Sequence, residues 1–286
     1  MKKLLLQKYN RIICAILLAL VAFIATATLN ACSFIGGGNA EKIPVLAYHK
    51  LIPAGTDRNS GLEIDEAKFE KQMKYLHDKG YKTLTLDEFY QWHAGEIELP
   101  KKSVLITFDD GYYSMYYLVY PILKKYDQAA TVFCIGRHIE DTTDEFDYTD
   151  NIQDHYIGMD KIEEIRKDYP KFEFQSHTYI MHDKVDGEKP AEVFTKEQML
   201  EDCKTMESRG FTPYLAYPWG TYTEKMQEAL KEGGIKMAFA YDPYYYALRS
   251  DDTYAINRIK IGGGIGMREF KKIIKGKDKG CNNPDA

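Results

Sequence analysis

Short apolar runs alternate with amphipathic stretches along most of the chain. Seven runs rich in apolar residues predict β-strands, and they span residues 44–48, 104–108, 131–135, 172–175, 214–217, 237–240 and 255–261. Several of them are continuously apolar, as expected for strands of a parallel sheet that is covered on both faces. The pattern therefore predicts a buried parallel sheet.

The stretches between these runs carry helical patterns. Apolar residues recur at helical spacing from residue 69, and Gly80 is a suitable end for that helix. Thr195 and Gln198 form a capping box at the start of a second helix, and residues 222–231 predict a third. About seven rounds of strand and helix predict an α/β fold, either a barrel or an open parallel sheet, and the chain length favours the barrel.

The first 31 residues have the pattern of a secretory signal. Residues 1–11 carry four basic side chains and no acidic one, and an apolar run follows that is too short to predict a membrane span. Leu29-Asn30-Ala31-Cys32 then resembles the lipobox of bacterial lipoproteins, in which Cys32 would be acylated and become the mature N-terminus. An ordinary signal peptide with an incidental cysteine is the alternative interpretation.

These features predict the organisation of the chain and its location. We expect a lipoprotein signal peptide over residues 1–31, a flexible Gly-rich tether over 32–42, one large domain over 43–275 and a polar tail over 276–286. Acyl chains on Cys32 would anchor the protein without spanning the membrane. The predicted location is the outer face of the cell membrane, after export.

The charge balance bears on the partners of the domain. The chain has 38 basic and 43 acidic residues, and removal of residues 1–31 takes away four of the basic ones, so the formal charge moves from −5 to −9. A strongly acidic protein is a poor match for nucleic acid. Nothing in the sequence implies an obligate protein partner.

Polar residues directly follow several of the predicted strands. They are Tyr48-His49, Asp109-Asp110-Gly111, Ser176-His177 and Pro218-Trp219-Gly220. In barrels and parallel sheets, catalytic groups collect where strands end and loops begin. This edge of the sheet is therefore the candidate site.

Two adjacent carboxylates follow the strand at 104–108. Asp109 and Asp110 repel each other and lose hydration unless a cation or another partner offsets both charges. Adjacent side chains of an extended chain point in opposite directions, so the two residues can have different roles. An ordinary Asp-Asp-Gly turn is the alternative interpretation.

Two histidines follow the strand at 172–175. His177 and His182 are five residues apart, a spacing that places them on different faces of a helix and on opposite sides of a strand. Only a strand that runs into a turn brings both rings to one point. Together with one carboxylate they match the two-histidine, one-carboxylate set of an open divalent metal site, which can activate a water molecule.

The three segments, in this order, resemble the motifs of the polysaccharide deacetylases, the family 4 carbohydrate esterases. Residues 107–111 are similar to the first motif of that family, 176–182 to the second and 216–220 to the third, and the similarity extends over most of residues 43–275. The longer spacing between the histidines is similar to the branch that includes poly-N-acetylglucosamine de-N-acetylases.

The resemblance implies a fold, a mechanism and roles for residues. It implies a distorted (β/α) barrel with about seven parallel strands and a divalent metal, zinc first and cobalt or nickel as alternatives. Asp110, His177 and His182 would be the metal ligands. Asp109 would be the general base, and the backbone N–H of Trp219 would help to stabilise the oxyanion.

The sequence departs from the family at two positions. Many members carry an arginine, paired with the catalytic base, where this chain has Ala216. Arg258 is a candidate replacement, and a packing role is the alternative. Many members also supply a histidine near the C-terminus as the general acid, whereas this chain has no histidine after His182. The candidate acids are His49, one of the two histidines of the metal site, and Asp109 once it has taken a proton. His49 is favoured because it also ends a strand, and a buried structural histidine is the alternative interpretation of it.

The resulting hypothesis is a hydrolase that removes N-acetyl groups from a cell-surface polysaccharide containing N-acetylglucosamine, either poly-N-acetylglucosamine or peptidoglycan. Two alternatives stay open at the level of sequence. One is O-deacetylation of a polymer such as acetylated xylan, because ester and amide hydrolysis share the same tetrahedral intermediate. The other is a glycan-binding lipoprotein that has lost the chemistry, which the missing family arginine and histidine would favour.

Overall fold

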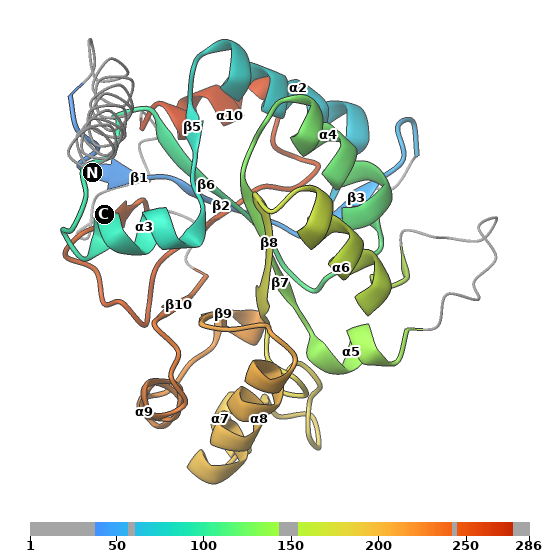
Figure 1. Cartoon of the computed structure of the whole chain (residues 1–286), viewed down its shortest axis with the longest axis vertical. Helices are drawn as coiled ribbons and strands as arrows, with labels where there is room; N and C mark the ends of the chain where they lie inside the picture. Colours follow the sequence, from blue (N-terminus) through green and yellow to red (C-terminus); the bar gives the residue numbers. More distant parts are fainter. Residues whose placement is uncertain (1–37, 57–60, 143–153, 242–244, 277–286) are drawn as a thin grey trace, which may run out of the picture. The chain divides into compact units, whose positions relative to one another are not determined.

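Seven parallel strands form the central sheet, in the order β10-β9-β8-β7-β6-β2-β12 (Figure 1). Their bounds are β2 (Val45–Tyr48), β6 (Ser103–Phe108), β7 (Ala130–Cys134), β8 (Phe172–Ser176), β9 (Tyr214–Ala216), β10 (Met237–Phe239) and β12 (Ile259–Lys260). The computed structural model describes residues 38–56, 61–142, 154–241 and 245–276. The predicted α/β fold with about seven parallel strands is confirmed, and each strand coincides with one of the predicted apolar runs.

The last strand is shorter than the sequence pattern predicts. Instead of one strand over 255–261, Ile256 forms an isolated parallel bridge with Phe239 of β10, and only Ile259–Lys260 pairs with β2. The main chain of Ile256 bonds to β10 at one end of this segment, and the N–H of Ile261 donates to the Ala47 carbonyl of β2 at the other, over 2.9 Å. One segment thus bridges both edges of the curled sheet, and a continuous strand along either edge cannot do this.

Short additional strands extend the sheet and flank it. β5 (Lys82–Thr83) pairs with β6 in parallel. β1 (Lys42–Ile43) pairs with β11 (Ala247–Leu248), and β3 (Lys50–Ile52) pairs with β4 (Glu63–Asp65).

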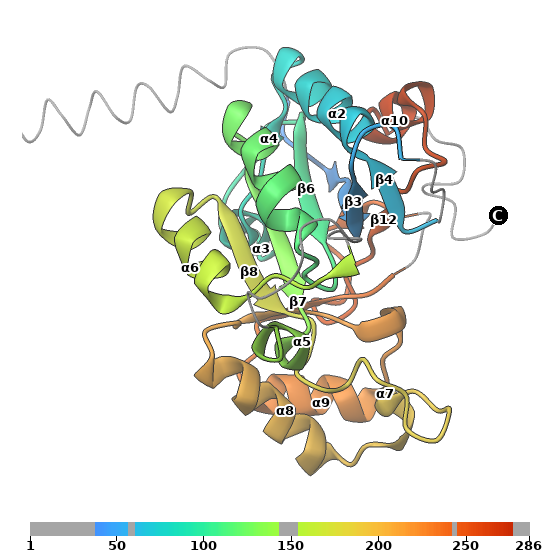
Figure 2. The ribbon, with the colours of Figure 1, turned by 90° about the vertical axis from the view of Figure 1, so that its right-hand side faces the viewer.

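Helices pack around the sheet. Those described are α2 (Glu66–Asp78), α3 (Leu86–His93), α4 (Tyr120–Lys125), α5 (Gly136–Glu140), α6 (Met159–Asp168), α7 (Pro190–Val193), α8 (Lys196–Ser208), α9 (Glu224–Glu232) and α10 (Met267–Ile274), with the π-helix η1 (Met115–Val119) and the 3₁₀ turn η3 (Pro218–Gly220). Of these, α3 is the one that contacts the inward layer of the sheet. Figure 2 shows α2, α4 and α6 along one side of the strands, with α10 beside α2, and α8 and α9 next to each other.

Local side chains fix where the helices begin. The capping box predicted for α8 is present: Thr195 Oγ1 accepts from the Gln198 N–H over 3.3 Å, and Gln198 Oε1 accepts from the Thr195 N–H over 2.8 Å. The helix predicted from residue 69 begins earlier, at Glu66, because Asp65 caps it through the Lys68 N–H.

Strand side chains alternate between two apolar layers. From β6, Ile106 and Phe108 point outward and pack in the cluster that includes α2 and α6 residues, whereas Leu105 points inward. The inward layer also contains Phe133 and Phe239, and Trp92 of α3 packs against it. This packed interior leaves only the ends of the strands for chemistry.

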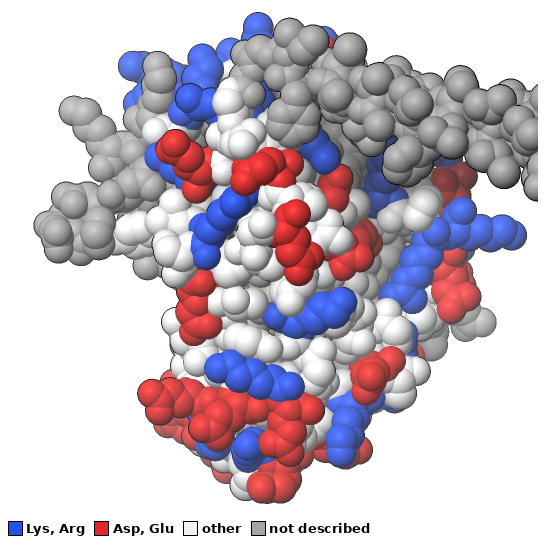
Figure 3. Space-filling view, turned by 60° about the vertical axis from the view of Figure 1, so that its left-hand side comes forward, with Lys and Arg blue, Asp and Glu red and all other residues white. Residues whose placement is uncertain are grey.

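The surface charge is mixed on the face drawn in Figure 3. Acidic side chains gather over the end that carries α8 and α9, where Lys196 pairs with Glu228 and Glu232. Within the described residues, no helix combines the length and the apolar composition that a membrane crossing requires.

The residues from Ala40 onward form one compact unit. The predicted signal peptide over 1–31, the acylation site Cys32, residues 33–37 of the predicted tether and residues 277–286 of the predicted polar tail lie outside the described residues. The last residues of the predicted tether belong to the domain instead, because the Ala40 N–H donates to the Leu99 carbonyl over 2.8 Å and β1 begins at Lys42.

Candidate active site

The candidate residues converge because parallel strands present their carboxyl ends at one edge of the sheet. His49 follows β2, Asp109 and Asp110 follow β6, and His177 follows β8. These strands belong to the same sheet, and their last residues are paired or separated by one strand. Short strands that end in polar residues therefore place several ionisable side chains within reach of one another.

Asp110, His177 and His182 form a triad in which the first two are buried and His182 is partly exposed. Oδ1 of Asp110 lies 3.5 Å from Nε2 of His177 and 3.4 Å from Nε2 of His182. Their potential ligand atoms all lie within 4.8 Å of one another. A carboxylate and two imidazoles at this separation are a ligand set that suits a divalent cation.

The backbone around Asp110 directs the two adjacent carboxylates to different partners. Asp110 has a φ of 73° and Gly111 a φ of 82°, so the chain leaves the extended conformation at the end of β6. Asp109 remains in line with the strand and faces the barrel interior, whereas Asp110 turns toward the histidines. A side chain at Gly111 would also meet Cys134 Sγ at 3.2 Å, so glycine is required there on two counts.

Each histidine of the triad is held by a different contact. Nδ1 of His177 lies 2.9 Å from the main-chain oxygen of Ala216, so Nδ1 carries the proton and Nε2 is left as a free acceptor that faces Asp110. The His182 ring stacks on the Trp219 ring, with centroids 5.0 Å apart and planes inclined by 25°. Trp219 Nε1 also donates to the main-chain oxygen of His182 over 3.2 Å.

Burial favours the neutral forms of all three residues of the triad, which suits the two imidazole ligands and opposes ionisation of the carboxyl. Burial raises the pKa of Asp110 to about 6, and the neighbouring charge of Asp109 adds to this effect. Burial lowers the pKa of His177 to about 3 and also lowers the pKa of His182. Both imidazoles are therefore neutral at pH 7, and Asp110 is largely ionised, so the residues fit a cation.

Asp109 is paired with Arg258 in the barrel interior. Nη1 of Arg258 donates to Oδ1 of Asp109 over 2.6 Å and Nη2 donates to Oδ2 over 2.8 Å. Arg258 Nε donates to the Ala240 carbonyl over 3.1 Å, and Nη1 also reaches Thr107 Oγ1 at 3.3 Å. The arginine is fully buried and Asp109 is 3% exposed.

This pair determines the protonation of Asp109. Burial alone would raise the pKa of the carboxyl, but the charge and the hydrogen bonds of Arg258 outweigh it and hold the pKa well below its usual value. The carboxylate is thus ionised at neutral pH.

His49 lies beside the same carboxylate. Its Nε2 is 3.9 Å from Asp109 Oδ2, and its side chain is 13% exposed. The ring packs edge to face with Tyr241, which follows β10, at 6.4 Å between centroids. One imidazole therefore borders the carboxylate on the side that solvent reaches.

Sequence comparisons identify the family of this site. The family model for polysaccharide deacetylase matches residues 96–238. YxkH of Bacillus subtilis (strain 168), named as a candidate polysaccharide deacetylase, is 30% identical over 237 residues, which cover 82% of this chain and 76% of that protein. The chain belongs to the polysaccharide deacetylase family. It is a hydrolase, and its motifs lie at the strand ends described above.

Other relatives of this deacetylase agree with the assignment. The poly-beta-1,6-N-acetyl-D-glucosamine N-deacetylase of Staphylococcus aureus (strain MRSA252) is 30% identical over 221 residues, covering 74% of this chain and 71% of that protein. The structure of IcaB from Ammonifex degensii has a TM-score of 0.65 at 25% identity and covers 84% of this chain and 98% of that chain. The Streptococcus pyogenes deacetylase PplD shares the fold, with a TM-score of 0.69 at 22% identity over 84% of this chain and 99% of that chain.

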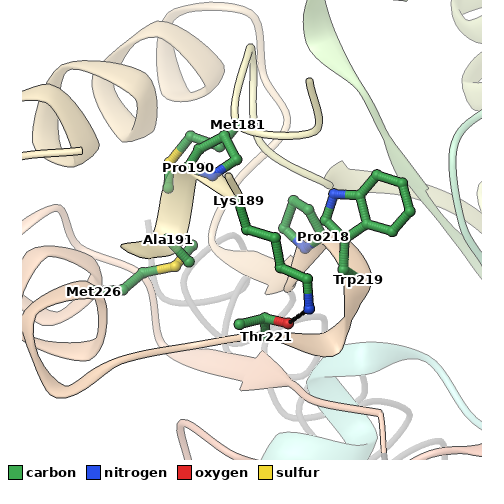
Figure 4. A pocket seen from close by; sticks show the side chains of 8 residues that line it. All are labelled: Met181, Lys189, Pro190, Ala191, Pro218, Trp219, Thr221 and Met226. Atoms are coloured by element: carbon green, nitrogen blue, oxygen red, sulfur yellow. Dashed lines mark hydrogen bonds between the residues drawn. The ribbon is translucent and has the colours of Figure 1, made fainter. Parts of the chain in front are cut away.

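The third motif of the deacetylase presents Trp219 at the rim of the site. Trp219 has a φ of 60° and is 51% exposed, although tryptophan is usually buried. A side chain at Gly220 would meet Tyr241 Cβ at 2.3 Å, so the turn needs glycine beside Trp219. Figure 4 shows a small crevice beside the indole, lined by Met181, Lys189, Pro190, Ala191, Pro218, Trp219, Thr221 and Met226.

Two contacts in this deacetylase were not anticipated from the sequence. The carbonyl of Ala216, a position singled out only for its lack of an arginine, orients His177. Asp202 of α8 accepts hydrogen bonds from the loop between His177 and His182. The contact made by a main-chain carbonyl cannot be predicted from the type of residue that carries it. In the sequence, Asp202 looks like one of several acidic residues on an amphipathic helix.

Proposed function

We propose that this protein is a metal-dependent deacetylase that removes N-acetyl groups from a polysaccharide of N-acetylglucosamine. The observation that carries the proposal is the Asp110, His177 and His182 triad beside the Asp109–Arg258 pair. The triad can hold a cation, and the pair offers an ionised carboxylate next to it.

Asp110, His177 and His182 would hold the metal through one carboxylate oxygen and two Nε2 atoms. Two imidazoles and one carboxylate favour zinc, and cobalt and nickel accept the same donors. These residues would thereby give the site the Lewis acidity of a bound cation toward the acetyl carbonyl and a water molecule.

Asp109 acts as the general base in this proposal. Arg258 keeps the Asp109 carboxylate ionised and holds both of its oxygens in place. The carboxylate is therefore ready to accept a proton from the attacking water. The arginine occupies the functional place of the arginine that many family members carry in the third motif.

The remaining roles fall to Trp219 and His49. The backbone N–H of Trp219, held in a left-handed turn beside His182, would donate a hydrogen bond to the oxygen of the tetrahedral intermediate. His49, 3.9 Å from Asp109, would carry a proton to the departing amine. The chain has no histidine after His182 that could serve as the acid, which supports His49 in this role.

The substrate class is supported by the named relatives. The Staphylococcus aureus relative at 30% identity acts, by its name, on an amide of poly-beta-1,6-N-acetyl-D-glucosamine. This favours an N-acetylated polymer over an O-acetylated one for the present chain. An exposed aromatic such as Trp219 beside the catalytic groups suits stacking against a sugar ring.

We further propose that the protein acts outside the cell, anchored by acylation of Cys32 after removal of residues 1–31. Metabolic labelling with a radioactive fatty acid tests this. Label in the wild type and none in Cys32→Ala is the expected result, and a labelled Cys32→Ala protein would contradict it.

Acetate release tests the enzymatic proposal. Purified protein is incubated with β-1,6-linked N-acetylglucosamine oligomers, acetylated xylan and peptidoglycan, each with chelator and with added zinc. We expect zinc-dependent release from the β-1,6 oligomers and little from xylan. Equal acetate release with and without chelator would contradict the metal dependence. Faster release from acetylated xylan would show that the enzyme hydrolyses O-acetyl esters rather than N-acetyl amides.

A further inference from the structure

The loop between the two histidines of the triad is held by hydrogen bonds from several elements. Ser176 Oγ accepts from the Thr178 N–H over 3.0 Å. On the side of α5, the N–H groups of Gly136 and Arg137 donate to the main-chain oxygens of Thr178 and Tyr179, over 3.0 and 3.1 Å. These bonds use the carbonyl groups of the loop and leave its next amides to be satisfied from another direction.

Asp202 supplies that second direction. Its Oδ1 accepts from the Tyr179 N–H over 2.8 Å and its Oδ2 accepts from the Ile180 N–H over 2.9 Å. The carboxylate projects from the middle of α8, more than twenty residues along the chain, and is 4% exposed. The buried carboxylate of a helix residue thus accepts from two adjacent main-chain amides of the loop, and the next amide, that of Met181, also interacts with it.

The geometry of the loop explains why a carboxylate is needed there. Thr178 has a φ of 70°, which turns the chain so that the following amides point to the same side. Buried N–H groups without acceptors are each costly. A carboxylate has two oxygens at the spacing of two neighbouring N–H groups, whereas an amide side chain has one oxygen and would turn its own N–H₂ toward the second amide.

His182 depends on this loop more than His177 does. His177 directly follows β8, and its ring is fixed by the Ala216 carbonyl. His182 lies beyond residues 178–181, and its other contact is with the half-exposed Trp219. Its side chain is 23% exposed, against 3% for His177. The position of Nε2 of His182 relative to Asp110 therefore follows from the path of the loop.

We infer that Asp202 is a positioning residue of the metal site, which sets the distance between His177 and His182 by fixing the amides of Tyr179 and Ile180. This inference rests on the proposed metal site. It assigns a role in metal affinity to a residue that touches neither the metal ligands nor the substrate. Supporting contacts of this kind typically change metal affinity by about 10–100-fold when they are removed.

Zinc affinity of the purified full-length protein, measured by competition with a chromophoric chelator, tests the inference. We expect Asp202→Asn to bind zinc about 10–100-fold more weakly than the wild type. Glu140→Gln is the matched control, because Glu140 accepts from the Tyr179 hydroxyl over 2.7 Å and so touches the side chain of the same residue without touching its amide. We expect Glu140→Gln to bind zinc like the wild type.

A second control separates positioning from general destabilisation. Leu230 of α9 belongs to the same apolar cluster as Met199 and Cys203 of α8, so Leu230→Ala weakens the packing around α8 and leaves the loop bonds in place. We expect Leu230→Ala to lower the unfolding temperature and to keep the zinc affinity. Hydrogen exchange of the Tyr179 and Ile180 amides in metal-free protein should accelerate in Asp202→Asn alone.

The outcomes distinguish the two proposals. Wild-type zinc affinity in Asp202→Asn overturns the positioning role and leaves the metal site standing. Equal loss of affinity in Leu230→Ala and Asp202→Asn also overturns it, because stability alone would then explain the loss. A wild-type protein that binds no zinc overturns the metal site itself and the role of Asp202 with it.

Discussion

Arg258 and Asp109 form a two-point hydrogen-bonded ion pair across 149 residues of sequence, with both nitrogen–oxygen distances under 3 Å and both side chains buried. Neither charge is stable there without the other, because burial of a single charge costs more than its remaining hydrogen bonds return.

Replacement of Arg258 therefore has two measurable effects. Arg258→Met leaves Asp109 buried and unpaired, so we expect the free energy of unfolding to fall by about 3–5 kcal/mol. The pKa of Asp109 is lowered in the wild type and should rise in the variant, which moves the acid limb of the pH–activity profile to higher pH. Denaturant unfolding and kcat/KM against pH measure both, and an unchanged profile would contradict the pairing role.

Asp109→Asn tests the general base. Asparagine retains the size of the side chain and cannot accept the proton, so we expect kcat to fall by about 10²–10⁴-fold while zinc still binds. Asp78→Asn, which breaks an exposed ion pair with Lys74, is the control and should retain activity. An active Asp109→Asn enzyme would refute the assignment of the base.

His177→Ala tests the metal ligands. The variant loses the buried Nε2 atom that is proposed to bind the metal and lies 3.5 Å from Asp110 Oδ1. We therefore expect its zinc content after dialysis to fall to background. His77→Ala removes an exposed histidine whose Nδ1 lies 3.2 Å from the Tyr126 carbonyl, and its zinc content should match the wild type. Undiminished zinc in His177→Ala would rule out this triad as the site.

Zinc affinity should fall as the pH falls through about 6. The pKa of Asp110 is raised to about 6, so below that pH a proton competes with the metal for the carboxylate. The pKa of His177 is lowered to about 3, so its Nε2 stays available throughout this range. We expect about a tenfold loss of affinity per pH unit below 6, as for one competing proton. Constant affinity from pH 7 to 5 would exclude Asp110 as a ligand.

Gly220→Ala tests the turn that carries Trp219. The new Cβ would lie 2.3 Å from Tyr241 Cβ, at a φ of +67°. Gly234→Ala shares the unfavourable φ, at +78°, and meets no atom within 4 Å. Both variants should lose about 1 kcal/mol to the backbone conformation. Only Gly220→Ala should lose further stability and acetate-releasing activity, and equal effects in both would mean that the turn tolerates displacement.

Most of the fold can be predicted from the apolar runs in the sequence. Strands such as β6 and β7 are predictable because residues 104–108 and 131–135 are apolar on both faces, and only a covered parallel sheet accommodates that. The segment at 255–261 was predicted as one strand and is split, because its pairing changes from β10 to β2 between Ile256 and Ile259. Such a change of pairing partner depends on which strand edges the segment meets in the folded protein, and the hydropathy pattern does not contain this information.

The site is predictable to the extent that its residues are chemically unusual. Adjacent aspartates and a pair of histidines after buried strands stand out in any sequence, and the structure brings Asp110, His177 and His182 together. Asp202 does not stand out in the sequence, because an ordinary acidic residue, Glu201, precedes it in the same helix. Glu201 is exposed, whereas Asp202 is buried. The difference between the two comes from the direction in which α8 faces the histidine loop.

The segment that bridges β10 and β2 also determines when the site is complete. The carboxylates and histidines occupy the first two-thirds of the chain, and Arg258 arrives with the last segment to join the sheet. Until that segment is in place, Asp109 has no cation to stabilise its buried charge. Closure of the curled sheet and pairing of the proposed base are therefore a single event. A chain that stops short of residue 258 would leave the proposed base without its arginine even if every proposed metal ligand were in place.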